Sequence, residues 1–221
     1  MPVELMHNTP LWICAHAVRT CWQSHGMSDT EHLNGGVIVG PKDMALIDKV
    51  GNKFKHSSTL EHLTYNFYIY GISRALLQEL ARHRITSLSV KSTRYTLKEL
   101  KDIDHIDATN MEAVSKFCVL TGNKTVDFAT GRALASLQSL VKDGIPNDIT
   151  KFALPDAYKT ELTWSINARS LQNFLKLRTD KAAMWEIRQL AYDVFDALPE
   201  DHKYLFTDYL YKESVENERR V

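Results

Sequence analysis

Several features that mark particular classes of protein are scarce or missing in this 221-residue chain. No stretch approaches the ~18 apolar residues needed to cross a bilayer, and the N-terminus has neither the basic region nor the apolar core of a secretory signal. The three cysteines lack CxxC spacing, which suggests neither a disulfide framework nor a zinc site. We therefore expect a cytoplasmic protein that does not enter a membrane.

An excess of charge of either sign is also absent. Lys and Arg number 27, as do Asp and Glu, so the formal net charge is zero. Broad, sequence-independent binding to nucleic acid needs a net basic surface, which this composition does not provide. Any basic site must be local, and we expect no nucleic-acid partner.

The composition otherwise matches an ordinary globular protein. A hydrophobic content of 44% can bury a core, and we expect one domain over residues 1–221, with a charged tail that frays after about residue 211. Cys14 and Cys21 are seven residues apart and would share one helix face, where we expect both to be buried as small hydrophobic side chains.

Capping and turn residues divide the chain into predicted elements. Thr9 is expected to cap a helix with Pro10 at its first position, and Pro41 opens a second helix with His56 near its end. The four glycines in residues 23–40 predict a loop or hairpin there. Further helices are predicted from Ser73 to the basic residues after Leu80, over residues 110–120 and 124–141, from Pro146, over residues 171–178 and over residues 181–198.

Two long strands are predicted by side chains that alternate in character along residues 62–71 and 158–166. Their aromatic faces are expected to lie in the core rather than to bind a cofactor. Each strand leads through a turn and a helix to basic residues. This arrangement suggests that the two basic ends could meet at one cleft.

The most informative segment is residues 82–95, which hold four cations, one histidine, five Ser or Thr hydroxyls and no acid. Arg82 and Arg84 flank His83, and such a group repels itself unless an anion is held there. Phosphate suits guanidinium forks and hydroxyls, so the segment predicts an anion site. A solvated basic face is the alternative interpretation.

Residues 82–84 (Arg-His-Arg), seven further residues and Ser92 resemble the signature of flavin-dependent thymidylate synthases, in which the same tripeptide precedes a serine at this spacing. Residues 56–62, which contain His-Ser-Ser and Glu-His, come just before the first long strand. Residues 167–178 resemble the family's second conserved segment. The resemblance runs from about residue 9 to residue 209 and so covers nearly the whole chain.

The resemblance implies a homotetramer of α/β subunits of the α+β type, each with a central antiparallel sheet flanked by helices. FAD and the nucleotide would be held between subunits. The implied reaction is the reductive methylation of dUMP to dTMP. NADPH would reduce FAD, methylenetetrahydrofolate would supply the one-carbon unit, and the reduced flavin would supply the hydride. The partners would be these small molecules, without nucleic acid or membrane.

The resemblance also assigns site residues. Arg178 is expected to be catalytic, because its guanidinium would face the uracil and stabilise negative charge developing on N3 and the neighbouring carbonyls. Residues expected to bind FAD are His56, Ser58, Glu61, His83, Arg84, Ile85, Val90, Asn167, Ala168, Arg169 and Asn173. Residues expected to bind the nucleotide are Glu79, Leu80, Ala81, Arg82, Val90, Lys91, Ser92, Thr93, Arg94, Lys151 and Arg178.

The chain departs from the family pattern at a few positions. Ser89 and Val90 stand where many members have Asn-Glu, so a carboxylate contact from that loop is missing. Glu79 stands where a glutamine is common, and Ala182 replaces a histidine that neighbours the flavin. Lys151 replaces an arginine that meets the nucleotide phosphate, which keeps the charge but loses the fork.

Other interpretations stay open on the sequence. A nucleotide-binding module without catalysis would use the same cations, whereas an RNA-binding protein is disfavoured by a short basic segment without interleaved aromatics. Ser92 is expected to bind rather than to act as a nucleophile, because the sequence positions no base beside it. No metal site is expected, because His56, His62 and His83 match no zinc spacing.

Overall fold

The computed structural model describes residues 2–212, which form two compact units. The middle unit comprises Met1–Pro2, Ile69–Arg82 and Leu88–Thr163. The terminal unit comprises Val3–Tyr68, His83–Ser87 and Trp164–Val221. The expectation of one domain over the whole chain stays a prediction, and most of the tail expected to fray lies outside the described residues.

A four-stranded sheet with the strand order β1-β4-β6-β5 contains the two strands predicted from alternation. They are β4 (Thr64–Ser73) and β6 (Lys159–Asn167), and both contribute residues to each unit. The outer strands, β1 (Val3–Asn8) and β5 (Thr86–Val90), are not predicted by the sequence. Most residues of β5 carry hydroxyl groups, and this composition suggests part of an anion site and not a strand.

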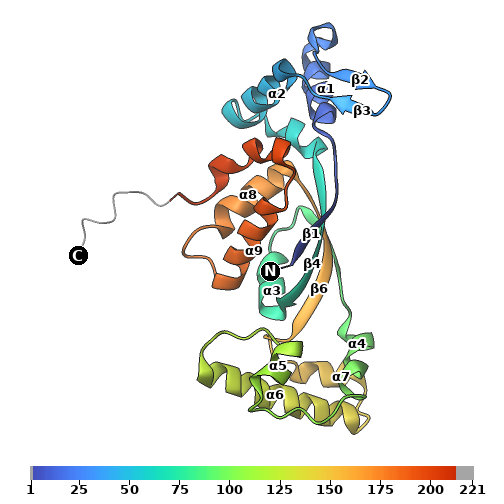
Figure 1. Cartoon of the computed structure of the whole chain (residues 1–221), viewed down its shortest axis with the longest axis vertical. Helices are drawn as coiled ribbons and strands as arrows, with labels where there is room; N and C mark the ends of the chain where they lie inside the picture. The colour runs from blue at the N-terminus through green and yellow to red at the C-terminus, as the bar shows by residue number, and fades with distance from the viewer. Residues whose placement is uncertain (1, 213–221) are drawn as a thin grey trace, which may run out of the picture. The chain divides into compact units, whose positions relative to one another are not determined.

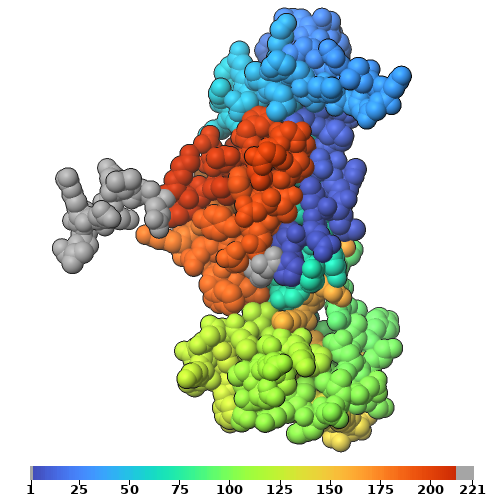
Figure 2. Space-filling view, in the orientation of Figure 1, coloured from blue at the N-terminus to red at the C-terminus, as the bar shows by residue number. Residues whose placement is uncertain are grey.

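The terminal unit holds the N-terminal and C-terminal helices. Figure 1 shows α9 beside β1, and in Figure 2 the orange to red surface of the C-terminal helices adjoins the dark blue surface of the N-terminal residues. The helices and hairpin strands of this unit are α1 (Leu11–Trp22), η1 (His25–Met27), β2 (Glu31–Leu33), β3 (Gly36–Ile38), α2 (Pro41–Asp48), the π-helix η2 (Lys49–Lys53), η3 (Ser57–His62), α8 (Ala168–Arg178), α9 (Trp185–Asp196), η6 (Glu200–Leu205) and η7 (Thr207–Tyr209).

The middle unit packs its helices around a separate apolar cluster. Ser73 and Asn110 cap the helices that follow them, since their side chains accept hydrogen bonds from the N–H groups of Leu76 and Ala113. The helices are α3 (Arg74–Leu80), α4 (Thr93–Thr96), η4 (Leu97–Leu100), α5 (Met111–Phe117), α6 (Lys124–Lys142), α7 (Asn147–Thr150) and η5 (Lys151–Ala153). The buried cluster consists of Leu97, Leu100, Ile106, Val114, Cys118, Leu134, Leu137, Val141 and Tyr158.

Two predictions about the first helix are wrong. Thr9 is not its cap, because Thr9 Oγ1 lies 2.8 Å from Thr64 Oγ1 and Pro10 occupies the N-cap position without a side-chain hydrogen bond. Cys14 is buried as expected, but Cys21 is exposed. Cys21 falls in the last turn of α1, where Trp22 is also 68% exposed, so this turn packs against little of the protein.

Two predicted helix boundaries also need correction. The regular part of the second helix ends at Asp48 and continues as a π-helix, so His56 lies beyond it. The last long helix begins at Trp185 instead of Lys181. The residues before it form a turn in which Asp180 Oδ1 accepts a hydrogen bond of 2.8 Å from the N–H of Ala182.

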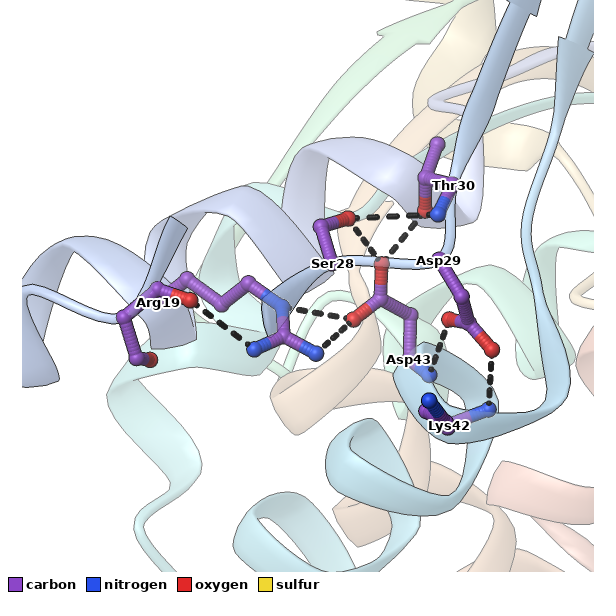
Figure 3. A network of polar contacts seen from close by, with 7 residues as sticks. Arg19, Ser28, Asp29, Thr30, Lys42 and Asp43 are labelled. Atoms are coloured by element: carbon purple, nitrogen blue, oxygen red, sulfur yellow. Dashed lines mark hydrogen bonds and ion pairs between the residues drawn. The ribbon is translucent and has the colours of Figure 1, made fainter. Parts of the chain in front are cut away.

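A buried ion pair fixes the segment between α1 and α2 (Figure 3). Arg19 Nε donates to Asp43 Oδ1 at 2.6 Å, and both side chains are almost completely buried. Ser28 and Thr30 donate to the other carboxylate oxygen of Asp43, each at 2.5 Å. Burial raises the pKa of Asp43, but these hydroxyls and Arg19 outweigh it and lower the pKa below its usual value. Residues 28–30 are therefore tied to the first turn of α2.

The sequence predicts a loop or a hairpin over residues 23–40, and the structure shows a hairpin. β2 and β3 pair antiparallel, with Glu31 opposite Ile38 and Leu33 opposite Gly36. Asp29 accepts hydrogen bonds from the N–H groups of Lys42 and Asp43, at 2.8 and 3.0 Å. Gly40 allows this approach, because a Cβ there would clash with Asp29.

Candidate functional site

The basic ends predicted to lie together meet in the terminal unit. Arg178 is the last residue of α8, and its Nε donates a hydrogen bond of 3.0 Å to Nε2 of His83. The two residues are 95 positions apart in the sequence. Phe174, one turn earlier on α8, packs edge-on against the His83 ring, with ring centroids 5.1 Å apart. His83 therefore contacts two side chains of the same helix.

This geometry determines which nitrogen of His83 carries the proton. A guanidinium has donors only, so Nε2 must accept and the ring proton of the neutral form lies on Nδ1. Phe174 is fully buried and packs against Trp164 of β6, with centroids 5.0 Å apart. The position of Arg178 is thus linked through His83 and Phe174 to the aromatic core of the terminal unit.

All residues expected to bind FAD belong to the terminal unit except Val90. Asn167 caps α8, because its Oδ1 accepts a 2.8 Å hydrogen bond from the N–H of Ser170. On the first turn, Arg169 Nη1 donates to Glu61 Oε1 of η3 at 2.6 Å. The side chain of Ala168 is buried, and its N–H donates to the carbonyl of Leu63, so its side chain faces the interior.

The other expected FAD-binding side chains have access to solvent. Exposed side chains are those of His56, Ser58, Arg84, Ile85 and Asn173. Cys14 Sγ donates to the carbonyl of Thr59, which anchors η3 to α1. The terminal unit therefore presents polar groups from η3, from the segment after His83 and from α8.

All residues expected to bind the nucleotide belong to the middle unit except Arg178. Lys91 Nζ donates to Glu99 Oε2 at 3.3 Å, and the other oxygen of Glu99 accepts a 2.8 Å hydrogen bond from the hydroxyl of Tyr158. Burial and the hydrogen bond to Glu99 raise the pKa of Tyr158, so its hydroxyl stays protonated. Asn147 Nδ2 donates to the carbonyl of Arg94 at 2.9 Å.

The sequence does not identify Glu99 or Asn147 as supports of this loop. Glu99 is the first acid after the basic segment, which is the one local signal that points to it. Asn147 lies 53 residues from Arg94, and no spacing rule connects the two. Both residues hold the segment around Ser92 in place.

The remaining residues expected to bind the nucleotide differ in solvent exposure. Leu80 is fully buried, so its side chain belongs to the core, whereas Arg82 is exposed and lies 3.5 Å from Glu79. Ser92 precedes α4, and its hydroxyl forms no hydrogen bond with any described residue. No described histidine or carboxylate is therefore bonded to Ser92 as a base would be, and its binding role stays a prediction.

The cysteines offer no activated thiol in the core. Burial raises the pKa of Cys14 and of Cys118 to about 12, so both remain protonated. Within residues 2–212, no group of three His, Cys, Asp or Glu side chains is arranged to hold a metal ion. No helix among these residues is both long and apolar enough to span a bilayer.

Comparison with known proteins gives one consistent family. The Thy1 family model, described as thymidylate synthase complementing protein, matches residues 4–202. A flavin-dependent thymidylate synthase of Wolinella succinogenes is 58% identical over 206 residues, which cover 93% of this chain and 97% of that protein. The chain belongs to the flavin-dependent thymidylate synthase family.

Two further relatives agree with this result. A flavin-dependent thymidylate synthase of Campylobacter jejuni is 54% identical over 213 residues, covering 96% of this chain and 99% of that protein. The crystal structure of thymidylate synthase X from Helicobacter pylori with FAD and dUMP is 51% identical and has a TM-score of 0.88. The structural match covers 96% of this chain and 100% of the Helicobacter pylori chain. The expected family and fold class are therefore confirmed, and the protein is a flavin-dependent enzyme.

Proposed function

We propose that the protein converts dUMP to dTMP by reductive methylation, with methylenetetrahydrofolate as the one-carbon donor and NADPH as the reductant. FAD, when bound, supplies the hydride. The observation that carries this proposal is the hydrogen bond between Arg178 and His83. It joins the residue expected to face the uracil to a residue of the expected flavin site.

The terminal unit is proposed to bind FAD through the residues assigned above. Arg84 and Arg169 offer guanidinium donors that suit a pyrophosphate, and Ser58 and Asn173 offer polar groups for the ring and its side chain. The ion pair with Glu61 orients the guanidinium of Arg169. The donor set therefore fits the cofactor, and the presence of FAD in the Helicobacter pylori structure supports the proposal.

The middle unit is proposed to bind dUMP. Arg94 and Lys151 are exposed cations that can meet the phosphate, and Ser92 and Thr93 can donate to it through hydroxyl and N–H groups. Lys91 shares its charge with Glu99, so it contributes less positive potential than the exposed cations. The dUMP in the Helicobacter pylori structure supports this ligand.

Arg178 is proposed to act electrostatically on the uracil. Its guanidinium stabilises negative charge that develops on N3 and the neighbouring carbonyls. The bond to His83 uses Nε, and the two Nη groups carry four further donors. His83 thus positions the guanidinium without using its Nη donors.

A homotetramer in the cytoplasm, with sites shared between subunits, completes the proposal. Large apolar side chains of the terminal unit support association, since Trp22 is 68% exposed, Met27 71% and Ile85 70%. Light scattering on the eluting protein tests the assembly. A fully active monomer would contradict it.

The decisive experiment is the visible absorption spectrum of the purified protein, followed anaerobically by NADPH with and without dUMP. We expect flavin bands that bleach faster when dUMP is present. A colourless protein that also fails to take up added FAD would overturn the proposal and favour a phosphate-binding module without catalysis.

A further inference from the structure

A cavity of about 580 Å³ with several charged residues in its lining lies within the terminal unit, and two of these residues are close in sequence to residues proposed to bind FAD. Its walls come from η2 and the residues after it, from the C-terminal half of α8, and from residues 208–212. Neither the family pattern nor the proposed reaction assigns these residues a role. The cavity is therefore a candidate for a second binding site.

Two buried side chains near the end of α8 hold the walls in place. Gln172 of α8 is 3% exposed, and its Nε2 donates to Asn52 Oδ1 at 2.9 Å and to the carbonyl of Leu205 at 2.8 Å. The buried Thr179 accepts a 2.8 Å hydrogen bond from the N–H of Tyr211. The walls are thus fixed by hydrogen bonds in the interior of the unit.

The charges in the cavity favour an anion. Lys55 and Lys176 line it from two different walls, and neither forms an ion pair with a described residue. Of the two acids in the lining, Asp208 pairs with Lys212 at 2.9 Å, whereas Asp180 accepts from the N–H of Ala182 and keeps its charge, so three lysines face two acids. Two lysines without acidic partners therefore face one cavity.

Lys55 has an unusual backbone conformation. Its φ of 54° lies in the left-handed region, which a residue with a Cβ seldom adopts. Glycine would adopt this conformation more readily, so the backbone conformation gives no reason for a lysine at position 55.

Both lysines adjoin residues proposed to bind FAD. Lys55 precedes His56 directly, and Lys176 follows Asn173 on α8 by three residues, a rise of roughly 4.5 Å along the helix axis. A ligand held by both lysines would therefore lie close to residues proposed to bind FAD. Of the proposed ligands, the two co-substrates that must approach the flavin are NADPH and methylenetetrahydrofolate.

We infer that this cavity binds the glutamate carboxylates of the folate co-substrate, an inference that rests on the proposed function. Folates carry one or more γ-linked glutamates, which form a flexible chain of separate carboxylates. Lysines are compact point charges that suit separate carboxylates, whereas phosphates favour arginine forks, and no arginine lines this cavity. The half-buried Tyr209 and Tyr211 add hydroxyl donors and apolar ring surface.

The test compares methylenetetrahydrofolate carrying one glutamate with the form carrying five. In the wild-type enzyme, we expect a KM about three- to tenfold lower for the longer form, the range set by two solvent-accessible ion pairs. The double variant Lys55→Gln/Lys176→Gln should abolish this difference and leave kcat and the flavin spectrum unchanged. Lys53→Gln is the matched control, because Lys53 is exposed nearby but pairs with Asp48 outside the cavity.

Calorimetric titration with a penta-γ-glutamate peptide supplies a readout that does not need turnover. Binding that the double variant loses and Lys53→Gln keeps would support the inference. The inference would be overturned if the wild-type enzyme had equal KM values for the two folates and did not bind the peptide. If that enzyme still formed dTMP, the proposed function would stand. A raised KM for NADPH with an unchanged folate preference would assign the cavity to the reductant and also overturn the inference.

Discussion

The hydrogen bond between Arg178 and His83 allows the proposed catalytic role to be tested through a second residue. We expect His83→Phe to slow dTMP formation strongly while it preserves the aromatic packing. A phenyl ring can keep the edge-on contact with Phe174 but has no nitrogen to accept from Arg178 Nε. The guanidinium then loses one of the contacts that hold it in position.

The expected size of the effect follows from the type of bond that is lost. A hydrogen bond to a charged group contributes about 1.5–3 kcal/mol, which corresponds to about a ten- to 150-fold loss in rate. Removal of the guanidinium itself in Arg178→Ala should cost about 2.7–4 kcal/mol, the range for a direct transition-state contact. The bond to His83 should therefore matter less than the arginine does.

Single-turnover dTMP formation by enzyme already loaded with FAD and dUMP is the appropriate assay. Because His83 is also proposed to bind FAD, flavin affinity is measured separately from its absorption. His83→Gln offers a carbonyl acceptor and should recover part of the lost rate. In the double variant, the effect of His83→Phe should largely disappear once Arg178 is alanine. Full additivity of the two substitutions would refute the positioning role.

Three further predictions concern the terminal unit and the cysteines. Asp43→Asn should destabilise the protein by about 3–5 kcal/mol in urea unfolding, because it leaves the buried Arg19 charge without its partner. Burial lowers the pKa of His202 below 6.5, so the unfolded state binds more protons than the folded state, and the free energy of unfolding should fall as the pH drops below 6.5. His202→Gln should weaken this pH dependence, and an unchanged dependence in the variant would contradict the prediction. Iodoacetamide at pH 8 should label Cys21 alone in the folded protein, without loss of dTMP formation.

Much of the fold follows from periodicity in the sequence. Alternation predicts β4 and β6, because every second side chain of each strand is buried in the core. Ser73 predicts the start of α3, because its side chain satisfies an N–H group three residues later. These signals are local, so a sequence window contains them completely.

The missed elements depend on partners that lie far away in the chain. β5 becomes a strand by pairing at the edge of the sheet, and its alternation of Leu88 and Val90 with two serines spans only five residues. Pro10 takes the cap position because Thr9 bonds to Thr64, which is 55 residues away. No local signal distinguishes such a threonine from a true cap.

The same limit applies to the site. Resemblance names His83 and Arg178 separately, but their contact depends on α3 and α8 ending at suitable places after strands of one sheet. Glu99 has no recognisable motif, and its role follows from the positions of Lys91 and Tyr158 in the folded middle unit. The family pattern therefore names expected ligand contacts, whereas the residues that support them emerge only from the fold.

The distribution of departures from the family pattern has a physical reason. Residues 167–178 match the family closely, and in this segment single side chains have several structural tasks. Asn167 caps α8, Gln172 joins three elements of the terminal unit, and Phe174 packs against both Trp164 and the His83 ring. Substitution of any of them would disturb packing as well as ligand contacts.

Most departures lie instead in the middle unit. Lys151 is exposed, and Val90 is 37% exposed at the end of an edge strand, so neither is constrained by close packing. Substitution there alters one ligand contact and leaves the support from Glu99 and Asn147 intact. Residues expected to contact the nucleotide can therefore vary one at a time, whereas those on α8 are held together by the fold.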